Sequence, residues 1–62
     1  MWGAVLVSRD LPWTMDETRD YLSDNTVQHW WHATFTSHEL ACRWAAGKKN
    51  YNSFRVHIVK VK

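Results

Sequence analysis

The chain has 62 residues, of which 45% are hydrophobic, and a formal net charge of +2. This length allows one small core, so we expect residues 1–62 to form a single domain without a deep substrate cleft. The apolar content excludes a disordered tail, no apolar run approaches the roughly 20 residues that span a bilayer, and the lone Cys42 excludes an internal disulfide. These features predict a soluble, cytoplasmic protein.

Residues 2–8, with the sequence WGAVLVS, are predicted to form the first strand, because they are apolar, partly β-branched and followed by charged residues. Both sides of this segment are apolar, which is typical of a strand in the middle of a sheet. We therefore expect residues 2–8 to have a partner strand on each side.

Residues 10–25 form an acidic connector, which contains five carboxylates and one guanidinium. Thr14 and Glu17 have the spacing of a capping box, which predicts a short helix from Thr14 to about Leu22. An irregular loop is the alternative, because the apolar stripe of such a helix is thin. Sixteen residues make a long connection for a compact domain, and long connections tend to be functional.

Residues 26–36 (TVQHWWHATFT) alternate in polarity, which predicts the second strand. The side expected to face the core carries Val27, His29, Trp31, Ala33 and Phe35. The opposite side is mostly polar and carries Gln28, Trp30, His32 and Thr34. This pattern places the Trp30 side chain on a wettable strand face.

A capping box at Thr36–Glu39 predicts a helix over residues 37–46. Its apolar stripe consists of Leu40, Ala41, Trp44 and Ala45. Gly47 is expected to end the helix. Residues 53–61 (SFRVHIVKV) alternate again and are predicted to form the third strand.

Together these elements predict an α+β fold, with a small three-stranded sheet and one well-defined helix packed on one face. The order is strand, connector, strand, helix, strand, with a second short helix if the connector forms one. A helix that joins the last two strands favours a parallel relation between them, with the first strand between and antiparallel to both. The other sheet face is then open or covered only by residues 10–25.

Five tryptophans are the most informative feature of the composition, because a domain of this size cannot bury them all comfortably. Trp30 is the predicted anchor for a binding partner; packing of Trp30 against the acidic connector is the alternative. His32 and Arg55 are its expected neighbours. An acidic contact for a basic groove on a protein partner is expected from Asp16, Glu17 and Asp20.

Metal-binding and catalytic chemistry find little support in the sequence. His38 and Cys42 lie one helical turn apart, but a structural zinc site needs four ligands. The same pair lacks evident oxyanion donors, the carboxylates lack a pocket, and there is no glycine-rich phosphate loop. We expect no metal, no cofactor and no enzymatic activity.

An aromatic-bearing first strand, a strand that leads into a capped, alanine-rich helix (ATFTSHELACRWAA) and an alternating last strand (FRVHIVKVK) occur in this order. This pattern, over roughly residues 2–9 and 27–61, is similar to the small host-RNA-polymerase inhibitor of T-odd coliphages. The chain departs from that inhibitor in its acidic connector and its tryptophan content, so no functional residue is transferred. The resemblance implies a compact phage protein that binds and blocks a host enzyme, such as a polymerase, a nuclease or a defence factor.

The primary hypothesis is therefore a non-catalytic protein-binding module, a phage-encoded inhibitor that occludes a host protein in the host cytoplasm. The alternative is a small protein that binds single-stranded nucleic acid through a basic and aromatic sheet face. That face would use Trp30, His32, Arg55 and His57, helped by Lys48 and Lys49. A third hypothesis is a homo-oligomer built through an unpaired edge strand. The chain is expected to be a monomer or small homo-oligomer without a membrane partner.

Overall fold

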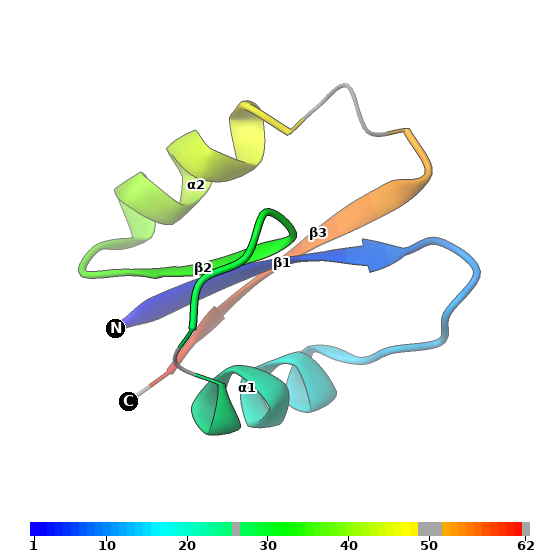
Figure 1. The fold of residues 1–62 in the computed structure, drawn as a ribbon, viewed down its shortest axis with the longest axis horizontal. Helices are drawn as coiled ribbons and strands as arrows, with labels where there is room; N and C mark the ends of the chain where they lie inside the picture. The colour runs from blue at the N-terminus through cyan, green and yellow to red at the C-terminus, as the bar shows by residue number, and fades with distance from the viewer. Residues whose placement is uncertain (26, 49–51, 62) are drawn as a thin grey trace.

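The computed structural model describes residues 1–25, 27–48 and 52–61 and has the predicted α+β fold (Figure 1). The elements follow in the order β1 (Trp2–Ser8), α1 (Met15–Asp24), β2 (His32–Phe35), α2 (His38–Ala46) and β3 (Phe54–Lys60). The acidic connector thus forms a helix, which was one of its two predicted states. No helix in the described residues is long and apolar enough to cross a membrane.

The sheet has the strand order β2-β1-β3, and β1 is antiparallel to both neighbours, which confirms the predicted central position of the first strand. Val5 lies opposite His32 on one side and opposite His57 on the other. The β1–β3 pairing extends along the whole of β1, and beyond one end of it Met1 N donates to Val61 O at 2.8 Å. Residues 3–7 of β1 are all buried, as expected for a strand with neighbours on both sides.

The two helices lie on opposite faces of the sheet (Figure 1). On the α1 face, Leu22 packs into a buried cluster with Val5, Val7, Val59 and Val61. On the α2 face, aromatic contacts join the helix to the strands. Trp2 of β1 meets His38 at a ring-centroid distance of 4.7 Å, and Phe35 of β2 meets Trp44 at 6.3 Å. The connector therefore covers the second sheet face, which the sequence predicted to be either open or covered only by residues 10–25.

The N-terminus of α1 is capped as its sequence predicts. Thr14 is the N-cap residue, and its Oγ1 accepts a hydrogen bond from Glu17 N at 3.2 Å. Asp16 and Glu17 lie in the first turn, where negative charge stabilises the helix dipole. The capping box thus found this helix correctly, although its thin apolar stripe left a loop as an alternative.

The N-terminus of α2 lies one residue later than its capping box indicates. Ser37, not Thr36, is the N-cap residue, and its Oγ accepts from Leu40 N at 3.2 Å. Glu39 instead pairs with Arg43, whose Nη2 lies 3.2 Å from Glu39 Oε1. Ala41 is fully buried against the sheet, whereas the Leu40 side chain, predicted in the apolar stripe, is exposed.

The second strand is much shorter than the alternation over residues 26–36 predicts, because β2 begins only at His32. Two backbone hydrogen bonds between His29 and His32, of 3.0 and 3.3 Å, close a tight turn with Trp30 and Trp31 at its tip. The predicted alternation of core and surface side chains is therefore wrong for Val27, His29 and His32. Val27 is 65% exposed, while His32 is buried.

Candidate functional site

Trp30 lies at the tip of this turn, and its side chain is 57% exposed. The turn is fixed to the central strand, because Leu6 N donates to Trp31 O at 2.7 Å. The Trp30 ring meets the edge of Phe54 at a centroid distance of 6.2 Å. The structure therefore presents an exposed indole on a turn that is hydrogen-bonded to the sheet.

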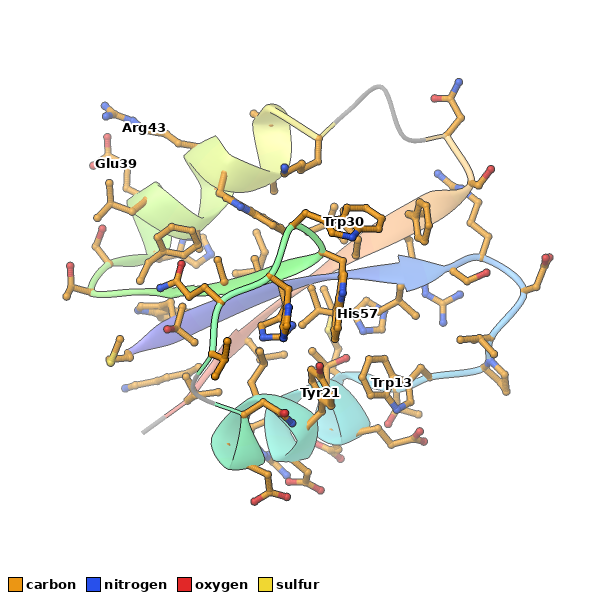
Figure 2. All side chains as sticks on the ribbon, in the orientation of Figure 1. Trp13, Tyr21, Trp30, Glu39, Arg43 and His57 are labelled. Carbon is orange, nitrogen blue, oxygen red and sulfur yellow. The ribbon has the colours of Figure 1, made fainter. Side chains whose placement is uncertain are left out.

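Trp30 lies on the α2 side of the sheet, as Figure 2 shows. The alternation of β3 gives the same result. His57 contacts Thr18 of α1, so Phe54, an odd number of residues away, faces α2. We call the exposed Trp30 indole and its neighbour Phe54 the Trp30 surface.

His32 does not accompany Trp30, although the sequence placed both side chains on one strand face. Its side chain is 1% exposed and faces α1, where its Nε2 lies 2.6 Å from Val27 O and its Nδ1 lies 3.4 Å from Tyr21 Oη. Burial lowers the pKa of His32, so the ring is neutral and donates its Nε2 proton to the Val27 carbonyl. The prediction of His32 as an exposed neighbour of Trp30 is wrong, because the turn reverses the chain between them.

Arg55 also faces α1, where it binds the start of the connector. Its Nη2 donates to Leu11 O at 2.6 Å and to Trp13 O at 3.0 Å. Its Nε donates to His57 Nε2 at 3.1 Å. The guanidinium therefore holds residues 11–13 against β3. The prediction of Arg55 as a neighbour of Trp30 is wrong, because the Arg55 side chain lies on the opposite face of the sheet.

His57 and Thr18 form a buried polar link that the sequence analysis missed. Thr18 Oγ1 donates to Thr14 O at 3.1 Å, so His57 Nδ1, 2.8 Å away, is the donor to Thr18 Oγ1. His57 Nε2 accepts from Arg55, so the ring is neutral. Burial, and next the positive charge of Arg55, lower the pKa of His57. Thr18 is completely buried, so a substrate has no access to this pair in the structure.

The three predicted acidic contact residues do lie together on the exposed surface of α1. Arg19 bridges two of them, with its Nη1 3.3 Å from Asp16 Oδ1 and its Nη2 3.5 Å from Asp20 Oδ1. Glu17 Oε1 accepts from Thr14 Oγ1 at 3.4 Å. These carboxylates belong to the α1 side of the molecule, so the structure separates them from Trp30 by the sheet.

A groove beside α1 is lined by Leu11, Pro12, Trp13 and Glu17 and has a volume of about 450 Å³. The Leu11 side chain is exposed. Trp13 is held by an edge-to-face contact with Tyr21 at a centroid distance of 5.4 Å. Figure 2 shows these two aromatic side chains next to each other at α1. We call this feature the Leu11–Glu17 groove.

Tyr21 is the centre of an aromatic cluster between α1 and the turn before β2. Its ring lies 5.5 Å from Trp31 and 5.3 Å from His32, and His29 stacks on Trp31 at 5.2 Å. Burial raises the pKa of the Tyr21 hydroxyl. Trp31 is thus half-buried against the core, as predicted, while Trp13 packs on the same cluster from the other side.

The candidate metal pair on α2 is present as a pair, with Cys42 Sγ 3.6 Å from His38 Nδ1. Among the side chains that the structure describes, no three His, Cys, Asp or Glu residues form a group that could hold a metal ion. Lys48 lies over the Trp44 ring, 5.3 Å from its centroid, and Lys49 lies outside the described residues.

Comparisons of the chain with protein-family models, with curated proteins and with solved structures give no match. A functional assignment therefore depends on the geometry of the two surfaces described above, the Trp30 surface and the Leu11–Glu17 groove.

Proposed function

We propose that this chain is a small, non-catalytic protein-binding module that inhibits a host enzyme by covering part of its surface. The observation that carries the proposal is the exposed Trp30 side chain on a turn that is hydrogen-bonded to the sheet. The resemblance to the coliphage polymerase inhibitor supplies the partner class, a bacterial enzyme met by a phage-encoded protein in the host cytoplasm.

Trp30 has the properties of an interface anchor. Tryptophan is among the residue types most enriched at binding hot spots, where truncation to alanine costs about 2 kcal/mol or more. The two backbone hydrogen bonds that close the turn, and a third to β1, order the backbone that carries the indole before a partner arrives. A turn that is already ordered loses little backbone entropy on binding, so more of the contact energy appears as affinity.

The nucleic-acid alternative requires Trp30, Arg55 and His57 on one sheet face, and they do not share one. Trp30 lies on the α2 side, while Arg55 and His57 lie on the α1 side, where Arg55 donates to His57 and to Leu11 O. The α1 surface is acidic, which opposes phosphate binding. These features favour a protein partner.

A pull-down of the tagged chain from bacterial lysate, with and without nuclease, tests the proposal. We expect one stoichiometric protein that survives nuclease and is lost with Trp30→Ala. Leu40→Ala is the matched control, because it truncates another exposed apolar side chain, 42% exposed, on α2. Recovery that disappears with nuclease would assign the chain to nucleic acid, and retention by a folded Trp30→Ala variant would remove Trp30 as the anchor.

A further inference from the structure

We propose that the Leu11–Glu17 groove binds a basic–apolar segment of the partner protein, with an arginine or lysine side chain beside an aliphatic one. The inference rests on the proposed function in one respect, that the partner is a protein. It concerns a second surface, because the groove belongs to the α1 side of the sheet and Trp30 to the α2 side.

Three of the four residues that line the groove are apolar. Leu11, Pro12 and Trp13 supply aliphatic and aromatic surface, and the volume of about 450 Å³ lies within the range of about 300–1,000 Å³ of sites that take small ligands. Such a volume accommodates more than one side chain. An aliphatic residue and the methylene stem of a neighbouring lysine or arginine both gain by leaving water here.

The fourth lining residue, Glu17, sets the charge of the occupant. Asp16 and Asp20, which Arg19 bridges, lie on the same helix with highly exposed side chains. Helix α1 carries four carboxylates and one guanidinium between Met15 and Asp24. The charge therefore selects a cation and disfavours acidic peptides and phosphate groups. Trp13 adds an aromatic ring, which also attracts a guanidinium or ammonium group.

Hydrogen bonds hold the backbone of the residues that line the groove. Arg55 donates to the carbonyl oxygens of Leu11 and Trp13, on either side of Pro12. Leu11 N donates to Ser8 O at 3.1 Å, and the Trp13 ring rests on Tyr21. A groove whose backbone is already fixed binds a short segment without first ordering a loop.

The test is a two-dimensional amide NMR titration of the full, ¹⁵N-labelled chain with two blocked tetrapeptides, Leu-Arg-Leu-Arg and Leu-Glu-Leu-Glu. They share their apolar residues and differ in charge. We expect the arginine peptide to shift the Trp13 indole signal and the amides of residues 11–17, saturably and less at high salt. The glutamate peptide should leave these signals unchanged.

Matched carboxylate variants assign the charge selectivity. Glu17→Gln should weaken binding of the arginine peptide about two- to fivefold, the effect expected of one exposed ion pair. Glu39→Gln, which neutralises an exposed carboxylate on α2, should leave it unchanged. Leu11→Ser removes apolar lining outside the helix and should also weaken binding. This second variant keeps the test valid if Glu17→Gln disturbs the N-terminal cap of α1.

Three results would overturn the groove assignment: no shift at millimolar arginine peptide, equal shifts with the glutamate peptide, or shifts centred on Trp30. Shifts at residues 11–17 on concentrating the chain without peptide would assign the groove to a second copy and overturn it as well. The titration needs no cellular partner, so it is separate from the pull-down. The Trp30→Ala variant should no longer bind the lysate partner but should still bind the arginine peptide.

Discussion

His57 Nδ1 lies 2.8 Å from Thr18 Oγ1, and this buried contact joins β3 to α1 across the core. The chain of hydrogen bonds continues from Thr18 to Thr14 O at the helix N-terminus, and from His57 to Arg55. Arg55 in turn holds the connector that lines the Leu11–Glu17 groove. A core contact is thus linked to a surface feature through three side chains.

Replacing Thr18 with valine, which has the same shape, should destabilise the fold by about 1–3 kcal/mol. The variant leaves the buried Nδ1–H of His57 without its acceptor, and an unsatisfied buried polar group costs about this much. Urea unfolding followed by circular dichroism measures the change. Thr36→Val, at an exposed position, should stay within about 0.5 kcal/mol. Equal effects of the two variants would contradict the role of the hydrogen bond.

Stability should decrease as the pH falls below about 6.5, the ordinary pKa of histidine. Burial lowers the pKa of both His32 and His57 in the folded protein, so between the lowered values and 6.5 the unfolded chain binds more protons. The contribution of these two histidines to the free energy of unfolding is therefore constant above this window and declines within it, by at most about 1.4 kcal/mol per pH unit for each histidine.

Urea unfolding at a series of pH values between 5 and 8 provides the measurement. His38→Gln, at an exposed histidine on α2, serves as the control and should retain the full pH dependence. Stability that is flat or rises on acidification from pH 7 to pH 5.5 would show that the two rings are not buried in their neutral form.

Arg55→Lys should loosen the connector even though it keeps the positive charge. Arginine reaches Leu11 O, Trp13 O and His57 Nε2 at once through its planar fork, and a lysine ammonium cannot reproduce this geometry. We expect faster amide hydrogen exchange in residues 9–14 and a weaker response of the groove to the arginine peptide. Arg43→Lys, in the exposed pair with Glu39, is the control and should change neither.

Gly3→Ala should destabilise the protein by about 1–3 kcal/mol, as overpacking of a core does. A Cβ at Gly3 would lie 2.4 Å from Leu22 Cδ1, and the Leu22 side chain is buried between α1 and the sheet. Gly47→Ala is the matched control. Its Cβ would meet the nearest atom at 3.4 Å, and its φ of −68° suits any residue. Thermal unfolding compares the two, and equal melting temperatures would argue against close packing of α1 on β1.

Local signals in the sequence were sufficient for α2 and for the first and last strands, and they gave α1 as one of two alternatives. Thr14 and Glu17 predicted the start of α1, and the apolar run over residues 2–8 predicted the central strand. The turn before β2 was missed because its tip, Trp30 and Trp31, contains none of the residues that favour turns, such as glycine, proline, asparagine or aspartate. The alternating pattern over residues 26–36 was therefore interpreted as one continuous strand, although the chain reverses its direction at residues 29–32.

The candidate surfaces were predictable only in part for the same reason. Trp30 is exposed as expected, but at the tip of a turn and not on a strand face. The burial of His32 depends on Tyr21 and Val27, which approach it only after α1 has packed. Contacts of this kind are set by tertiary structure. No local pattern indicates that Arg55 reaches back more than 40 residues to Leu11.

The pairing of β1 with β3 joins the two ends of the described chain, from Met1 with Val61 to Arg9 with Ser53. Of the three strands, the central one is therefore synthesised before its two partners, and its longer partner follows both. On the ribosome, the apolar segment 2–8 must wait for residues 54–60 before its second edge is paired. A nascent chain that stalls before Phe54 displays the strand that the finished protein buries most completely, and such exposed apolar segments are what chaperones and proteases select.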